Sequence, residues 1–524
     1  MHNEDKTTSF GGIHIMAADS AGWARKAVVL FATTLALLWP AFVNGGPFWF
    51  PDTSTYIRGA DAAVVHLLGS PSEWSDRLVE QNAPRSKKPA VEEPSVALGA
   101  SSVKPTRPIF SGRSIYYGFL IYLPMRLLGV WGAILCQAML TAAAILWCLG
   151  IITQGADHRR KIYAIAGVVV ICFMTPLPYY VAMLMPDVFA GVIVAVLTTL
   201  LVFHERIPLY QKVLAGLSCA AMATFHTSFM LLAIFCTVLV ALSLVTRKGL
   251  WKPLVIGIPI VLIAILANVI FTAGVARALN KEPIAPPFLS ARLIADGPGV
   301  AFLDRECQRD PASWTLCQHR AKLPMESDEF LWSDNPTRSV FGSADEQTQR
   351  RLAREDKRFF VNVFADAPLS VLRQSLAGTF KVLTDFRIIN FNYDEERVQS
   401  FAAKLPPEIA VQMAETRAAH GQMPVHFQAV LTLLSTLASL SIIVLVAARS
   451  IRDGVGLSPQ MVRMVAILVL ACLANAAICG ALSSPTSRYQ MRLIWLVPFA
   501  AIAAVTLAGN LRRVSTVKSE EGAG

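Results

Sequence analysis

Two aspartates and an arginine stand at the edges of apolar segments, where an acid and a cation could act on one substrate. Asp52 follows the apolar segment 27–43 in a stretch rich in aromatic residues and proline. Asp187 directly precedes another apolar run, and Arg488 lies shortly before a third. A positioned carboxylate can accept the proton of an attacking hydroxyl, and a guanidinium suits a phosphate group. These residue types therefore suit group transfer from a lipid-linked phosphate, with Asp52 and Asp187 as candidate catalytic acids.

Each of these residues also has a purely structural interpretation. Asp52 and Asp187 occupy positions where an aspartate commonly caps a helix N-terminus. Asp187 could alternatively hold a metal ion, so a divalent metal stays an open possibility for the cofactor. Arg488 and Tyr489 could simply anchor a helix end among lipid headgroups.

Arg113 and Arg492 are weaker candidates for binding the phosphate than Arg488. His226, which lies in a polar interruption of an apolar stretch, is a further candidate for substrate binding. A polar residue at membrane depth often marks a functional site, but a histidine bonded to nearby carbonyls would look the same. Cys307 and Cys317 stand apart from the other cysteines and could form a disulfide.

The amino-acid composition indicates which kind of structure holds these residues in place. The chain has 524 residues, of which 54% are hydrophobic and only 16% are charged, whereas soluble domains carry about 25% charged residues. The apolar residues gather in runs, most of them long enough to cross a bilayer, which takes about 20 residues in a helix. We therefore expect an all-α polytopic membrane protein. The net charge of +11 is spread over short loops, which follows the positive-inside pattern and does not indicate nucleic-acid binding.

The runs predict about ten spans. We expect a cytoplasmic N-terminus at 1–26, a membrane domain of seven spans at 27–273 with a non-cytoplasmic loop at 44–113, a large non-cytoplasmic loop domain at 274–423, three further spans within 424–510, and a cytoplasmic tail at 511–524. Both termini are thus expected on the cytoplasmic side. Alanine- and leucine-rich spans favour a bacterial inner membrane.

Three short stretches between the spans carry structural expectations of their own. The range 114–128 predicts an interfacial helix that leads into a span at 130–152. Residues 224–228 predict a polar turn between two short spans. Leu369, Leu372, Leu376, Phe380 and Leu383 recur at helical spacing within the large loop and predict an amphipathic helix on the membrane or over the spans; a core helix of the loop domain is the alternative.

In this layout the chain resembles the GT-C superfamily of membrane glycosyltransferases, which use polyprenyl-phosphate-linked sugars. The resemblance rests on short motifs at matching places: Phe50-Pro51-Asp52-Thr53, the helix that starts near Ser111-Gly112-Arg113, Pro186-Asp187, the hairpin around His226, and Ser487-Arg488-Tyr489. The chain departs from many members, which have paired acids in the first loop and carry their soluble domain at the C-terminus.

The resemblance implies transfer of a sugar from a polyprenyl-phosphate donor to a glycan, lipid or protein acceptor on the outer face of the membrane. Rival interpretations are a transporter or lipid flippase, a membrane acyltransferase or polysaccharide polymerase, and a non-catalytic envelope-assembly protein. The sequence shows no Walker A, Rossmann, HExxH or GxSxG pattern, and its short cytoplasmic loops leave no room for a nucleotide-sugar domain. Both points favour a lipid-linked donor.

Overall fold

The computed structural model describes residues 11–69, 72–75, 114–244, 251–279, 282–333, 335–454 and 457–508. Over these ranges the chain is mainly helical, and an isolated β-bridge joins Phe48 to Met183. The expected all-α class is confirmed for these residues. Arg113 and the predicted tail 511–524 lie outside the described residues.

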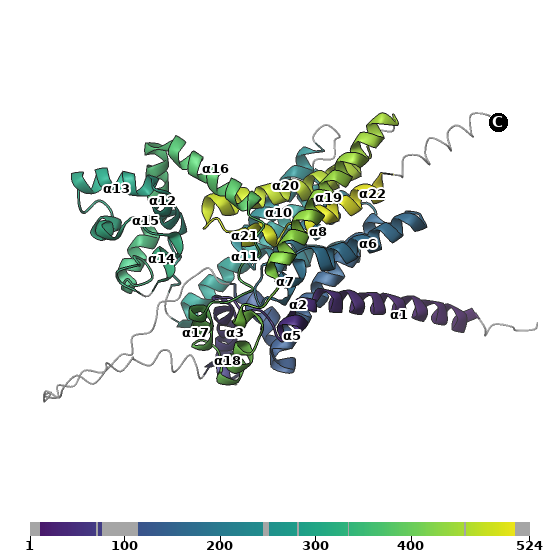
Figure 1. The fold of residues 1–524 in the computed structure, drawn as a ribbon, viewed down its shortest axis with the longest axis horizontal. Helices are drawn as coiled ribbons and strands as arrows, with labels where there is room; N and C mark the ends of the chain where they lie inside the picture. The colour runs from purple at the N-terminus through teal and green to yellow at the C-terminus, as the bar shows by residue number, and fades with distance from the viewer. Residues whose placement is uncertain are drawn as a thin grey trace, which may run out of the picture.

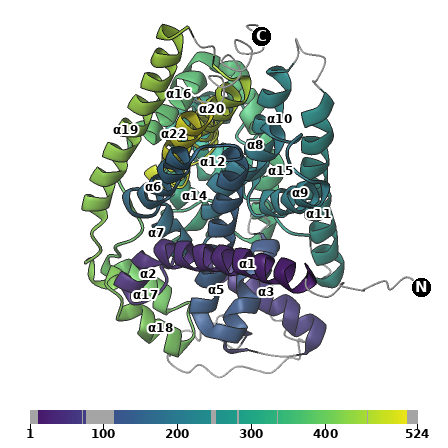
Figure 2. The same ribbon diagram turned by 90° about the vertical axis from the view of Figure 1, so that its right-hand side faces the viewer.

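A bundle of helices, some long and some short, makes up most of the molecule (Figure 1). The N-terminal part supplies α1 (Gly11–Leu37), α2 (Trp39–Asn44), α3 (Thr53–Leu68), α5 (Ile115–Ile152), α6 (His158–Met174), α7 (Leu177–Ala182), α8 (Val188–Val202), α9 (Leu209–Ala223), α10 (Thr227–Leu242) and α11 (Trp251–Leu279). The C-terminal part adds α19 (Val425–Arg452), α20 (Pro459–Leu482), α21 (Ser487–Met491) and α22 (Leu496–Leu507). Figure 2 shows α8 and α10 inside this bundle, with α19 and α11 on opposite sides.

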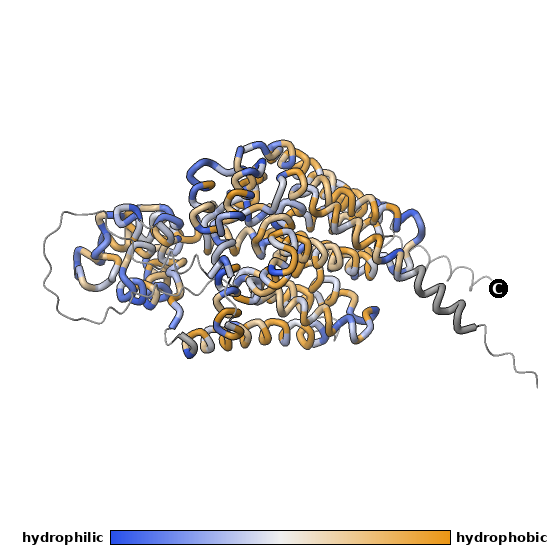
Figure 3. Tube along the Cα trace, turned by 90° about the horizontal axis from the view of Figure 1, so that it is seen from below, coloured by the Kyte–Doolittle hydropathy of each residue, from blue (hydrophilic) through white to orange (hydrophobic). Residues whose placement is uncertain are grey.

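Five helical stretches among the described residues are long and apolar enough to cross a membrane. They are Ile115–Ile152, Trp251–Arg277, Val425–Arg452, Pro459–Leu482 and Ser487–Leu507. α8 and α10 are apolar but shorter. Most residues along the Cα trace of the bundle are hydrophobic (Figure 3), and α11 and α19 turn rows of large apolar side chains outward. Lipid is the solvent that such a surface requires, so the chain is a membrane protein. The count of ten spans stays a prediction.

The helices around the first polar loops follow the sequence closely. α5 contains the predicted interfacial helix and the following span, separated by a kink where Leu128 and Gly129 leave helical geometry. Gly129 has a φ of 63°, which only glycine adopts without strain. The predicted polar turn separates α9 from α10. The break in the helix and the polar turn are confirmed, whereas the interfacial position of the segment before the break stays a prediction.

The predicted loop domain 274–423 divides into two parts. The helices α12 (Phe288–Asp296), α13 (Pro298–Arg309), η2 (Thr315–Lys322), α14 (Ser327–Trp332) and α15 (Glu346–Asp366) enclose a separate core around Phe302, Trp314 and Phe359. The second part holds α17 (Glu395–Ala402), α18 (Pro407–Ala414) and η3 (Ala418–His420), and its buried residues join the core of the bundle. Only the first part, which we call the α12–α15 module, stands apart (Figure 1).

The helix α16 (Pro368–Thr384) joins this module to the bundle. It crosses α20 so closely that a Cβ atom on Gly378 would lie 2.3 Å from the carbonyl oxygen of Gly480. Its other face leaves Leu369, Leu372, Leu376 and Phe380 largely exposed. The amphipathic pattern is therefore confirmed. Because Val371 joins the core of the α12–α15 module, the alternative of a core helix holds for part of α16, and its place on the membrane stays a prediction.

Candidate functional site

Two loops at one end of the bundle are held side by side by backbone hydrogen bonds. The amide of Phe48 donates to the carbonyl of Ala182 at 2.9 Å, and the amide of Leu184 donates to the carbonyl of Phe48 at 3.0 Å. The Thr53 hydroxyl, at the start of α3, donates to the carbonyl of Leu184 at 3.0 Å. This pairing places the segment that carries Asp52 beside the one that leads to Asp187.

Side chains from other helices fix these loops. The Gln137 amide, from the spanning part of α5, donates to the carbonyls of Val181 and Met183 at 3.0 Å each. Its oxygen accepts from the Tyr117 hydroxyl at 2.7 Å. On the other side, the Tyr393 hydroxyl accepts from the amide of Trp49 at 2.8 Å. Buried polar groups that are satisfied in this way specify a unique geometry.

Asp187 is the centre of a buried ion cluster. Its two carboxylate oxygens accept from Arg488 Nε at 3.0 Å and Nη2 at 2.8 Å, which is a bidentate pair. A second guanidinium, that of Arg492, donates to the same carboxylate at 3.2 Å. The Asp187 residue is 1% exposed. Burial by itself raises the pKa of the Asp187 carboxyl, but Arg488 and Arg492 outweigh it and lower the pKa to about 2.

The sequence interpretation of Asp187 changes with this geometry. It precedes α8, yet its side chain makes no capping hydrogen bond to that helix, so the capping alternative is not what the structure shows. A carboxylate with both oxygens on arginine is also a weak proton acceptor, because its charged form is strongly stabilised. Asp187 therefore positions the two arginines, and a catalytic role for its carboxylate stays a prediction.

Arg492 extends the cluster into the bundle core. Its Nη2 donates to the Ser228 hydroxyl at 3.1 Å and to the Asn475 side-chain oxygen at 3.2 Å. The Asn475 amide in turn donates to the carbonyl of Tyr489 at 2.7 Å. Since the Arg492 side chain is only 1% exposed, it reaches no substrate itself. It is an interior anchor for α21.

His226 joins this network at its edge, through Ser228. It is the residue before α10, and its Nδ1 accepts from the amide of Ser228 at 3.1 Å and lies 2.8 Å from the Ser228 hydroxyl. Because Ser228 also binds Arg492, His226 orients a member of the cluster. The hydrogen-bonded interpretation of His226 is closer to the structure than direct substrate binding.

Asp52 and Arg488 form the accessible edge of the site. Phe50 places its ring 4.0 Å from the Arg488 guanidinium, a cation–π arrangement. Asp52, two residues further on, lies within electrostatic reach of the same guanidinium. It precedes α3, but its side chain makes no capping hydrogen bond there. Asp52 is half-buried, whereas Asp187 is fully buried.

The remaining predicted residues have varied outcomes. The Tyr489 ring lies 5.0 Å from the Arg492 guanidinium, and its hydroxyl is 2.9 Å from that of Ser483. A disulfide joins Cys307 to Cys317 in the α12–α15 module, which was one of the options that the sequence left open. In the part of the chain that the structure describes, no three histidine, cysteine, aspartate or glutamate residues gather as metal ligands.

Sequence reasoning gave too little weight to Arg492, and it did not select Ser228 or Phe50. One signal was available: Arg488 and Arg492 are four residues apart, so a helix brings them to one face. Asn475 was noted only as a polar residue in a span, which is itself a functional indication. Ser228 and Phe50 carry no comparable signal.

The chain matches no family model, no curated protein and no solved structure. Its function therefore has to be argued from the chemistry of the site and the layout of the sequence.

This chemistry combines one accessible carboxylate with one partly accessible guanidinium. In the cluster, Asp187 balances one of the two arginine charges, and Asp52 as a carboxylate balances the other until it takes up a proton. A fixed guanidinium on an aromatic ring costs little reorganisation when it meets developing negative charge. The space next to Trp49, Phe50 and Pro51 is only about 10 Å³, so a substrate has to displace side chains here.

Proposed function

We propose that the chain is a membrane glycosyltransferase that moves a sugar from a polyprenyl-phosphate donor to an acceptor hydroxyl. The observation that supports this most is the juxtaposition of Asp52 and Arg488, with Arg488 fixed by Asp187 and by the Phe50 ring. The reaction needs a base for the acceptor and a cation for the departing phosphate. Both groups are present at one end of a membrane bundle.

In the proposed reaction the acceptor oxygen bonds to the anomeric carbon while its proton passes to the Asp52 carboxylate. The bond between that carbon and the phosphate oxygen breaks, and its electron pair leaves with the polyprenyl phosphate. Arg488 stabilises this charge by hydrogen bonding. Asp187 and Arg492 hold Arg488 in place. One sugar is inverted at its anomeric carbon in each turnover.

The site is proposed to face the non-cytoplasmic side of a bacterial inner membrane, with both termini in the cytoplasm. This follows from the basic loops of the sequence. The roughly ten spans belong to the same proposal. The polyprenyl tail lies in the bilayer, and the acceptor is a glycan, lipid or protein of the cell envelope.

The test is an assay of the purified full-length protein in proteoliposomes with a panel of polyprenyl-phosphate sugars. Release of polyprenyl phosphate is measured by mass spectrometry, with a membrane extract supplying acceptors. Asp52→Asn is expected to reduce release about 10²- to 10⁴-fold, the range for loss of a general base. Glu415→Gln is the matched control, because it removes one exposed carboxylate near the same end of the bundle.

Equal rates for Asp52→Asn and Glu415→Gln would remove Asp52 from the mechanism. Absence of turnover with every donor, from protein that unfolds cooperatively, would reject the transferase. Tagging that placed residues 44–69 in the cytoplasm would reject the proposed orientation.

A further inference from the structure

A second site lies away from the Asp52–Arg488 edge, where the α12–α15 module meets α16 and the end of α20. A cavity of about 170 Å³ opens there. It is smaller than the 300–1,000 Å³ usual for whole small molecules, so its volume suits a short length of a longer ligand. The proposed sugar transfer does not use it.

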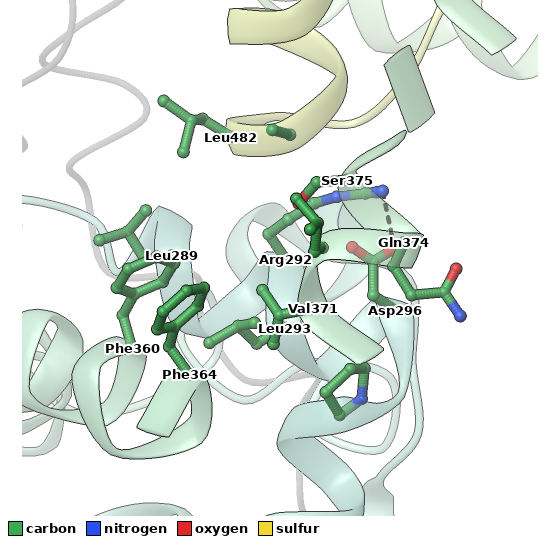
Figure 4. Close-up of a pocket in the computed structure, with 13 residues that line it drawn as sticks. Leu289, Arg292, Leu293, Asp296, Phe360, Phe364, Val371, Gln374, Ser375 and Leu482 are labelled. Atoms are coloured by element: carbon green, nitrogen blue, oxygen red, sulfur yellow. Dashed lines mark ion pairs between the residues drawn. The ribbon is translucent and has the colours of Figure 1, made fainter. Parts of the chain in front are cut away.

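The cavity has two chemically different walls. Figure 4 shows Leu289, Phe360 and Phe364 on one side, and Arg292 and Asp296 on the other, near Gln374 and Ser375. The first wall is hydrocarbon and the second is polar. A ligand that satisfies both has an apolar chain with an oxygen-bearing group attached.

The polar wall has a hydrogen-bond donor without a partner. Arg292 is 8% exposed, and its Nη2 pairs with Asp296 at 2.7 Å. Its Nε, however, is buried without a hydrogen-bond partner among the described residues. The Arg292 side chain also lines the cavity, so its guanidinium offers hydrogen-bond donors to the oxygen of a ligand.

The charges around Arg292 select a neutral acceptor. Asp296 already balances the guanidinium, and Glu326 acts electrostatically on it as well. One cation thus faces two carboxylates. A carboxylate or phosphate head would add a third negative charge, whereas an ester carbonyl adds none.

The exposed apolar side chains at the mouth of the cavity indicate that it opens toward lipid. Three of its lining side chains are themselves exposed: Phe364 at 46%, Leu372 at 53% and Leu482 at 41%. Leu482 ends the membrane-spanning helix α20, so the mouth lies at the end of a span. Leu372 also belongs to the exposed apolar face of α16. That face therefore continues the lipid-facing surface of the bundle.

We propose that this cavity binds the acyl-ester part of a bilayer glycerophospholipid. The acyl chain lies against Leu289, Phe360 and Phe364, and the ester carbonyl accepts from the Arg292 guanidinium. The bound lipid fixes the α12–α15 module against the membrane through α16. This inference stands without the proposed sugar transfer, because it involves none of the same side chains.

The test uses the full-length protein in phosphatidylcholine nanodiscs that contain phosphatidylcholine with a photoreactive acyl chain. After illumination, mass spectrometry locates the labelled peptides. Label is expected on the peptides of Phe364, Leu372 and Leu482. The variants Ser375→Trp and Ala481→Trp fill the cavity and are expected to reduce this label at least fivefold. Leu440→Trp, on the exposed side of α19, is the matched control and keeps it.

A double variant tests the polar contact. Arg292→Met together with Asp296→Leu removes donor and counter-ion at once, which avoids a lone buried charge. It is expected to lower the cavity label about tenfold, corresponding to one hydrogen bond to a charged group, with no loss of label on α19.

Two results would overturn the proposal. One is cavity label that neither tryptophan variant changes, which would mean ordinary lipid contact at the surface. The other is at least tenfold stronger labelling by an anionic phosphatidylglycerol or free fatty acid probe than by the phosphatidylcholine probe. Should one tryptophan variant fail to fold, the other and the double variant still decide the outcome.

Discussion

The α12–α15 module and the end of the bundle use charge in opposite ways. In the module, ion pairs such as Arg338–Glu329 and Arg309–Glu306 lie at the surface, with the arginine side chains 69% and 75% exposed. In the bundle, Asp187, Arg488 and Arg492 are buried together. Exposed pairs contribute about 0–1 kcal/mol each, whereas buried charges are expensive unless they are fully paired. The buried cluster is therefore the better indicator of function.

The largest expected effect comes from breaking the buried cluster. Asp187→Asn leaves Arg488 and Arg492 without their counter-ion, so the free energy of unfolding should fall by about 3–5 kcal/mol. Thermal unfolding of the detergent-solubilised protein measures this. Glu329→Gln breaks an exposed pair in the module and should change stability by about 1 kcal/mol or less. If the two variants unfold alike, the cluster is not a stabilising centre.

The next effect distinguishes the charge of Arg488 from the geometry of its guanidinium. Arg488→Lys keeps the positive charge but loses the bidentate pair with Asp187 and the planar contact with Phe50. We expect release of polyprenyl phosphate to fall about 10- to 100-fold, mostly in kcat, because the departing phosphate gains its charge in the transition state. Arg373→Lys, on the exposed face of α16, is the control. Full activity of Arg488→Lys would show that only charge matters.

A smaller effect tests how the two regions are joined. Gly378→Val places side-chain atoms against the carbonyl of Gly480, where a Cβ alone would lie at 2.3 Å. Overpacking of this kind costs about 1–3 kcal/mol, so we expect a lower unfolding temperature and faster proteolysis between α15 and α16. Gly216→Ala in α9 meets no atom within 4 Å and should be neutral or slightly stabilising. Equal behaviour would contradict the close crossing.

The smallest effect concerns the module alone. Hydrogen bonds from the Thr348 hydroxyl and amide hold the pKa of Asp345 below its ordinary value. A lowered pKa in the folded state means that this contribution is present at neutral pH and fades as pH falls through the folded pKa. Asp345→Ala should cost about 1 kcal/mol as a lost helix cap. Hydrogen exchange of the first turn of α15 measures this at neutral pH, and thermal unfolding between pH 3 and 6 should show a shallower acid loss. Unchanged exchange in the variant would contradict the cap.

Much of this architecture could be predicted from the sequence, because apolar runs and their breaks are local signals. The apolar run after Asp187 forms α8, and the kink at Gly129 and the turn before α10 lie where polar or helix-breaking residues interrupt apolar stretches. Contacts between distant segments were less accessible. The bridge between Phe48 and Met183 and the pairing of Asp187 with Arg492 depend on packing that no local pattern encodes. The sequence also did not show that the large loop would divide, since both parts have similar composition.

The pairing of Asp187 with Arg488 spans 301 residues, and this separation has a consequence for synthesis of the chain. At about 5–20 residues per second, the aspartate is made roughly 15–60 s before its counter-ion emerges from the ribosome. Throughout that interval an uncompensated acid sits at the head of an apolar helix. Synthesis of α21 is thus the event that balances the charge. A product truncated before Ser487 would keep the Asp187 carboxylate without its counter-ion.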